Sequence, residues 1–204
     1  MKGFDQQVED YFTRLRKTVD VVPKADVATL ARLLLQAYDH DKLVITMGNG
    51  GHGATASHFI NDLSKHTVVS DRKDEVVVTQ KRFRALCLLD NLSLVTAWAN
   101  DTGYENVFVQ QIANWVGAGD LVIAVSGSGN SENILRALSL ANERGAITVG
   151  IAGYQGGKMK QVAQHSIIVP GEDDLLIEDM HLSIFHAVTS AVRRELQGRM
   201  RHES

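Results

Sequence analysis

The chain has 204 residues, 44% of them hydrophobic, and its formal net charge is −3. This length suits one well-buried domain and is short for two, so we expect a single domain spanning residues 1–204. Proteins that grip nucleic acid carry clustered lysine and arginine, whereas this chain has no basic block. We therefore expect no nucleic-acid partner.

The chain has one cysteine, Cys87, and it lies within an apolar run. This setting is typical of a buried small hydrophobic residue and leaves no second cysteine for a disulfide. No apolar run approaches the length of a membrane span, and no basic N-terminal start leads into an apolar core. These features predict a cytoplasmic protein without a membrane partner.

Apolar residues recur at helical spacing in two N-terminal segments, and short apolar runs then alternate with further helical segments. Helices are expected at 4–22, 24–38, 53–65, 91–99, 104–116, 131–144, 157–163 and 175–197. Strands are expected at 43–47, 85–88, 121–125, 147–151 and 166–169. This alternation predicts an α/β fold, in which helices cover a five-stranded parallel sheet over residues 41–200.

Two segments are not needed for that sheet. The helices within residues 1–40 have apolar faces that we expect to pack against a partner subunit. Residues 67–84 are polar and charged, which predicts an exposed connection with subunit or substrate contacts. The sequence does not distinguish between those two roles.

Two loops rich in glycine and polar residues follow buried-type strands and open helices. The first is Gly48-Asn49-Gly50-Gly51, and the second runs from Ser126 to Ser131. Glycine allows close approach of the backbone to a ligand, and the first amides of a helix favour an anion. The first loop is equally well read as an ordinary turn. The second, with three spaced serines, predicts a site for a terminal phosphate.

Neither loop has the third glycine of a dinucleotide fingerprint or the Gly-Lys-Ser/Thr ending of a nucleotide-binding loop. We therefore expect no nucleotide cofactor.

Histidines and carboxylates recur at helical spacing on two predicted helices. His58 and Asp62 are four residues apart, and Glu178 and His186 are eight apart, so each pair shares a helix face. Together they offer four nitrogen and oxygen ligands of the kind that zinc accepts. Spacing alone favours a plainer interpretation, in which His58 and Asp62 form a surface hydrogen bond and His181 or His186 is a core histidine.

Several spaced motifs occur in order along nearly the whole chain. They are Gly48-Asn49-Gly50-Gly51, Ala56-x-His58-Phe59, Asn100-Asp101-x-Gly103-Tyr104, Ser126-x-Ser128-Gly129-Asn130-Ser131, Gly156-Gly157-Lys158-Met159 and the helix from Glu178 to His186. In these motifs the chain resembles the sedoheptulose 7-phosphate isomerases (phosphoheptose isomerases) of the sugar isomerase (SIS) domain superfamily. The resemblance implies a flavodoxin-like three-layer αβα sandwich, a homotetramer with active sites at subunit boundaries, and one zinc ion per subunit.

The resemblance also implies roles for individual residues. Substrate binding falls on Asn49, Gly50, Gly51, His52, Asp101, Ser126, Gly127, Ser128, Ser131 and Glu178. The metal ligands fall on His58, Asp62, Glu178 and His186, and the catalytic pair on Asp62 and His186. Four positions depart from the family pattern: His52 stands for serine, Gly127 for threonine, Asp62 for glutamate and Glu178 for glutamine.

The implied activity is an aldose-ketose isomerisation of sedoheptulose 7-phosphate to D-glycero-D-manno-heptose 7-phosphate through an enediol-type intermediate. Residues alone do not say whether Asp62 or His186 is the base. Two alternatives stay open. The four departures favour an isomerase or binding protein for a different phosphosugar. The other alternative is that the chain is like a non-enzymatic relative that binds a replication initiator. The chain retains His186 and a four-ligand set, which favours the enzyme.

Overall fold

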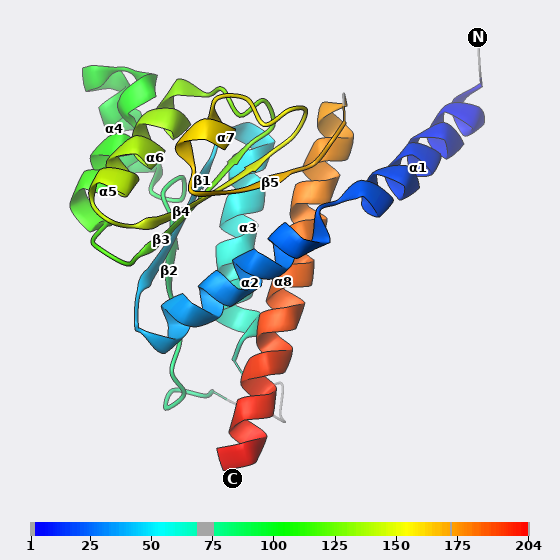
Figure 1. The fold of residues 1–204 in the computed structure, drawn as a ribbon. Coiled ribbons are helices and arrows are strands. Elements are labelled where there is room, and N and C mark those ends of the chain that lie inside the picture. The colour runs from blue at the N-terminus through cyan, green and yellow to red at the C-terminus, as the bar shows by residue number, and fades with distance from the viewer. Residues whose placement is uncertain (1–2, 69–75, 172, 204) are drawn as a thin grey trace.

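A computed structural model describes residues 3–68, 76–171 and 173–203 (Figure 1). The helices are α1 (Phe4–Val21), α2 (Lys24–Asp39), α3 (Gly50–His66), α4 (Leu92–Thr102), the 3-10 helix η1 (Tyr104–Asn106), α5 (Val109–Trp115), α6 (Glu132–Glu143), α7 (Met159–Val162) and α8 (Asp174–Glu203). The strands are β1 (Leu43–Gly48), β2 (Arg84–Cys87), β3 (Leu121–Ser126), β4 (Ile147–Ala152) and β5 (His165–Ile168).

Within the described residues, the strands form one parallel sheet of five in the order β2-β1-β3-β4-β5. All six residues of β3 are buried, which explains its continuous apolar run. Because β1 and β3 are neighbours, with Val44 opposite Leu121, the chain leaves their carboxyl ends in opposite directions. This is the switch point at which open α/β sheets bind ligands.

Helices cover both faces of the sheet and complete the expected three layers (Figure 1). Side chains of α2, α3 and α8 form the core on one face, including Leu34, Phe59 and Phe185. Side chains of α5 and α6 build the core on the other, including Ile112 and Leu138. The α/β fold with a five-stranded parallel sheet, predicted from the alternation of elements, is therefore confirmed.

Helix α1 extends away from the body of the molecule in Figure 1 and has no buried residue. Its side chains include Phe4, Val8 and Phe12, which are among the exposed large hydrophobic residues. The predicted apolar face thus exists, and no described part of the same chain covers these three side chains.

Three predicted segments differ from the structure. The helix expected over 104–116 is divided into η1 and α5, because Val107 and Phe108 turn into the core and are fully buried. The last helix continues to Glu203. The expected exposed connection includes residues 69–75, which lie outside the described residues; Val76 and Val78 are exposed, but Thr67 and Phe83 are buried. Phe83 is buried because it packs on the ring of Tyr38.

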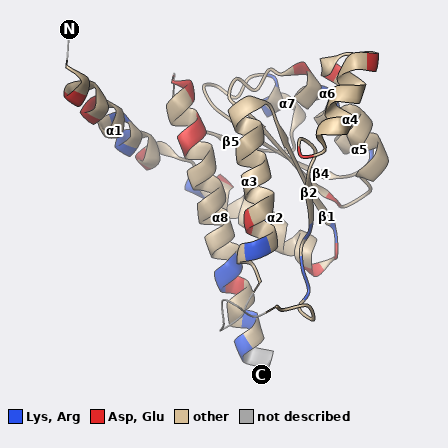
Figure 2. Cartoon of the chain, turned by 180° about the vertical axis from the view of Figure 1, so that it is seen from behind, with Lys and Arg blue, Asp and Glu red and all other residues tan. Residues whose placement is uncertain are grey.

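Blue ribbon, which marks lysine and arginine, recurs along the C-terminal half of α8 (Figure 2). The C-terminal half of α8 carries Arg193, Arg194, Arg199 and Arg201. Asp39 accepts from Arg199 at 2.6 Å, so part of this basic end is paired with α2. Among the described helices, none is both long and apolar enough to cross a membrane.

Candidate active site

The two predicted loops meet at the switch point of the sheet. The side-chain amides of Asn49, before α3, and Asn133, in the first turn of α6, donate to one another at 3.0 and 2.9 Å. The hydroxyl of Tyr104 donates to Asn49 Oδ1 at 2.9 Å. This pairing holds the first loop against the second, so both helix N-termini serve one site.

The backbone amides at these helix starts have few side-chain partners, although the amide of Ile134 in α6 donates to Asn133 Oδ1 at 3.0 Å. The N-cap residues Asn49 and Ser131 form no side-chain capping bond to α3 or α6. The first N–H groups of a helix have no intrahelical acceptor, and the helix dipole makes this end favourable for an anion. The anion site at the serine loop stays a prediction, and the first loop has both interpretations open.

Hydrogen bonds within the serine loop link its residues to one another. Ser126 Oγ accepts from the amide of Gly129 at 3.2 Å and lies 3.3 Å from Ser131 Oγ. Ser128 Oγ accepts from the amide of Asn130. At Gly129, φ is +65° and an added Cβ would lie 2.1 Å from the carbonyl oxygen of Gly156, so only glycine fits there.

Farther along α3, two predicted side chains, His58 and Asp62, converge with His186 from α8. His58 Nε2 lies 3.1 Å from His186 Nε2, and Asp62 Oδ2 lies 3.4 Å from the first and 3.5 Å from the second. The two imidazoles are about half exposed, whereas the Asp62 side chain is 7% exposed. Among the described residues, this trio forms a group able to hold a metal ion.

The spacing of these atoms fits zinc. Ligands about 2.0–2.1 Å from a tetrahedral zinc ion are about 3.3 Å apart, close to the three distances found here. Two imidazoles and a carboxylate leave a fourth position open, which is the arrangement of catalytic zinc sites. The pocket around the trio, of about 370 Å³, is also lined by Thr189, whose buried hydroxyl has no partner within the described chain.

Helix packing explains how residues 128 positions apart come together. Phe59 follows His58, Phe185 precedes His186, and the two phenyl rings stack with centroids 4.0 Å apart and planes 9° apart. Both rings are fully buried. The stack therefore fixes α3 against α8 directly beside the metal-binding group.

Glu178, the fourth expected ligand, lies two turns before His186 on α8 and is not in the trio. Its Oε1 is next to Gly51, where an added Cβ would lie 1.6 Å from that oxygen. Glu178 therefore lies at the first loop, among the expected substrate contacts. Asp101 is exposed in the last turn of α4, where it accepts from Asn100 at 2.9 Å.

His52 and His181 form a second histidine pair near the loops. Their Nδ1 atoms are 3.4 Å apart, and His181 is fully buried. Burial, then the nearby His52, lower the pKa of His181 to about 3, while the Ala152 backbone acts in the opposite direction. Burial also lowers the pKa of His52, against the opposing effect of Glu178 and Asp174.

Sequence reasoning missed three residues of this site. His66 Nε2 lies 3.6 Å from Asp62 Oδ1, and its spacing of four residues from Asp62 was a usable signal. Asn133 and Tyr104 position Asn49, but only the folded chain brings them to it. His181 is a core histidine, as one of the open interpretations proposed, whereas His186 is not.

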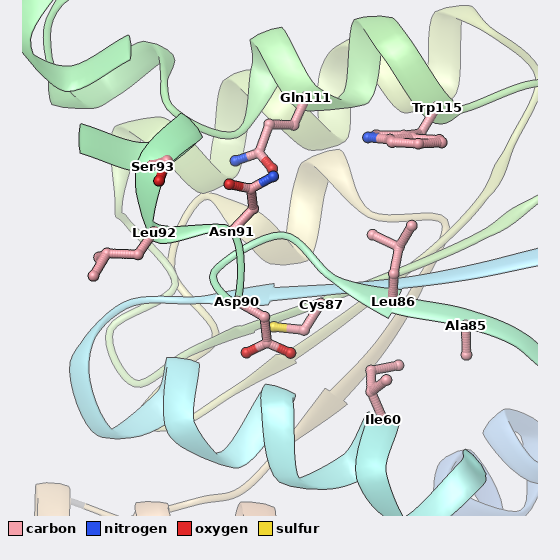
Figure 3. Close-up of a pocket in the computed structure, with 10 residues that line it drawn as sticks. All are labelled: Ile60, Ala85, Leu86, Cys87, Asp90, Asn91, Leu92, Ser93, Gln111 and Trp115. Atoms are coloured by element: carbon pink, nitrogen blue, oxygen red, sulfur yellow. The ribbon is translucent and has the colours of Figure 1, made fainter. Parts of the chain in front are cut away.

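A separate pocket of about 650 Å³ lies beside β2 (Figure 3). Its lining includes Asp90, Asn91, Gln111 and Cys87, and none of the predicted site residues. Cys87 is buried, as predicted, and burial is the main cause that raises the pKa of its thiol. A buried thiol with a raised pKa is a poor nucleophile.

The fold and site together define an α/β protein in which two glycine-rich loops meet at the switch point of a parallel sheet and α3 and α8 bring together a group able to hold a metal ion. Residues 7–153 match the SIS domain family. The phosphoheptose isomerase of Citrifermentans bemidjiense is 34% identical over 170 residues, which are 83% of this chain and 84% of that protein. That of Geobacter metallireducens is 34% identical over 92% of this chain and 98% of the relative.

A solved structure of the phosphoheptose isomerase from Neisseria gonorrhoeae has a TM-score of 0.81 and 25% identity to this chain. The match covers 93% of this chain and 98% of that one. The chain belongs to the SIS domain family and, within it, to the phosphoheptose isomerases.

Proposed function

We propose that the protein is a zinc-dependent isomerase that converts sedoheptulose 7-phosphate to D-glycero-D-manno-heptose 7-phosphate. The observation that carries the proposal is the convergence of His58 and Asp62 with His186. The first two lie on α3, which starts at the first loop, and His186 lies on α8. The names of the curated relatives support the substrate. An enzyme of this class must hold a phosphate at one end of a sugar chain and move a proton at the other.

The loops supply the phosphate site in this proposal. The serine loop and the first amides of α6 bind the terminal phosphate, because they combine backbone N–H groups with hydroxyls of Ser128 and Ser131. The first loop, with Gly50 and Gly51, binds the sugar. Asp101 and Glu178 accept hydrogen bonds from sugar hydroxyls, since an ionised carboxylate only accepts.

Asp62 and His186 move the protons. One of them takes the proton from the carbon next to the carbonyl, the other holds the proton of the adjacent oxygen, and the proton returns at the neighbouring carbon to give an enediol-type course. His58, Asp62 and His186 would hold zinc, whereas Glu178 lies at Gly51, two turns before His186. Bound zinc supplies polarisation of the carbonyl and hydroxyl oxygens.

The assembly in this proposal is a homotetramer with its sites at subunit boundaries. Helix α1 supports it, because Phe4, Val8 and Phe12 form an exposed apolar row on a helix with no buried residue. Residues 1–40 would then serve mainly in oligomerisation. Sedimentation of the purified chain tests the mass of the assembly.

The test of the function combines zinc content with turnover of sedoheptulose 7-phosphate. We expect about one zinc ion per subunit, appearance of the aldose product, and loss of turnover in His186→Ala. A zinc-loaded wild type without turnover would contradict the heptose substrate. Assay of other aldose and ketose phosphates under the same conditions would then identify a different phosphosugar.

A further inference from the structure

His52 and Gly127, two of the four departures from the family pattern, are in contact. A Cβ built on Gly127 would lie 2.5 Å from His52 Nε2, and the next atoms are those of the same imidazole. Gly127 is buried between Ser126 and Ser128 in the serine loop. The imidazole therefore fills the space that a side chain at position 127 would occupy.

The structure also indicates which nitrogen of His52 carries its proton. His181 is fully buried, and its Nε2 has no hydrogen-bond partner among the described residues. The Ala152 backbone also hydrogen-bonds His181, and because Nε2 has no partner this bond falls on Nδ1, so Nδ1 carries the proton of the neutral ring. Nδ1 is thus shared between the Ala152 carbonyl and His52 Nδ1, 3.4 Å away.

This contact leaves the proton of a neutral His52 on Nε2, because a neutral imidazole donates from one nitrogen and accepts at the other. Nε2 is the atom that faces Gly127. A hydrogen-bond donor thus lies close to where the hydroxyl of a serine or threonine at position 127 would be. Gly127 lacks the hydroxyl that the family pattern has at this position, and His52, in the first turn of α3, supplies a hydrogen-bond donor near the same place.

We infer that His52 binds the substrate phosphate in place of the missing side chain at position 127, and that His181 is the positioning residue that fixes its donor nitrogen. The inference rests on the proposed function, since it assumes that the serine loop holds a phosphate. Under this inference, positions 52 and 127 are coupled, because a histidine at position 52 leaves room only for glycine at position 127.

The test is a double-mutant cycle read by calorimetric binding of sedoheptulose 7-phosphate and of inorganic phosphate. We expect His52→Ala to weaken binding about 10- to 100-fold, as for loss of a hydrogen bond to a charged group. Gly127→Thr should weaken it similarly, because threonine displaces the imidazole. The double variant His52→Ser with Gly127→Thr should recover affinity to within a few-fold of the wild type. His165→Ser, an exposed histidine on β5, is the matched control.

Two further readouts separate this role from a structural one. Zinc content should stay unchanged in the position 52 variants, while nitrogen-15 NMR of the wild type should report the Nε2–H form of His52 and the Nδ1–H form of His181. The Nδ1–H form of His52, or independent effects of the two single substitutions, would overturn the inference with the proposed function intact. A wild type that binds neither ligand would overturn both.

Discussion

His58 and His186 hold their Nε2 atoms 3.1 Å apart, although they come from two helices separated by 128 positions in the chain. Asp62 Oδ2 lies within 3.5 Å of both. A pair of imidazole nitrogens and a carboxylate oxygen at these distances surround a single point, which is the geometry of a three-ligand zinc site.

Removal of one imidazole should release zinc. We expect His58→Ala to lower zinc affinity at least 100-fold, since two ligands hold the ion far less well than three, and metal analysis after dialysis measures this. His40→Ala, on the exposed end of α2, is the control and should keep its zinc. Equal zinc content in the two variants would contradict the assigned site.

Loss of the Asp62 charge should abolish turnover with little change in shape. Asp62→Asn keeps the size of a side chain that is only 7% exposed but removes the negative oxygen beside His58, His66 and His186. General acid-base groups contribute about 10²–10⁴-fold, so we expect kcat to fall by at least that factor. Steady-state kinetics measures the loss, with Asp41→Asn on the surface as the control; wild-type kcat in Asp62→Asn would exclude the residue from catalysis.

The aromatic stack next to the histidines should affect both stability and the site. Phe185→Ala removes a fully buried ring stacked on Phe59, which typically costs about 3–5 kcal/mol in free energy of unfolding. Zinc affinity should fall as well, because α3 and α8 lose their contact beside His58 and His186. Urea unfolding and zinc titration measure the two effects. Val78→Ala, at a position that is 80% exposed, should change neither.

The buried histidine predicts a loss of stability in acid. The pKa of His181 is about 3 in the folded chain against an ordinary value of 6.5. Between these values the unfolded chain binds one more proton, so the free energy of unfolding falls as the pH is lowered, by up to about 1.4 kcal/mol per pH unit. The lowered pKa of His52 acts in the same direction.

His181→Asn should remove that part of the pH dependence. Urea unfolding from pH 4 to pH 8, with a chelator present for both proteins, should give a curve that is less steep below pH 6.5 for the variant. Both proteins should show little contribution from this position above pH 7, where the histidine is neutral in either state. Parallel curves throughout would show that His181 does not contribute to the acid sensitivity.

The fold was predictable because its signals are local patterns that can be read within each strand or loop alone. Buried strands such as Leu121–Ser126 are apolar throughout, and glycine and serine loops mark where helices begin, so the order of strands and helices was predictable. The break after η1 was not, because Val107 and Phe108 have the same apolar character whether they continue a helix or turn into the core.

The site was predictable in part. The four-residue spacing placed His58 with Asp62, and the eight-residue spacing singled out His186 with Glu178, but spacing within α8 could not show that Glu178 lies at Gly51. Nor could it show that His52 and Gly127, 75 positions apart, are in contact, since that proximity depends on the β1–β3 pairing. Asn133 contacts Asn49 for the same reason.

Helix α3 begins at the first loop and carries His58 seven residues after Gly51, which is about 10 Å along its axis. An α-helix does not stretch, so the protein keeps the sugar-binding first loop and the histidines at a fixed separation. Under the proposed function, this fixed separation selects substrates by the number of carbons in the sugar chain. A shorter sugar phosphate seated in the same site would stop before the histidines, and a longer one would have to fold back to present its carbonyl.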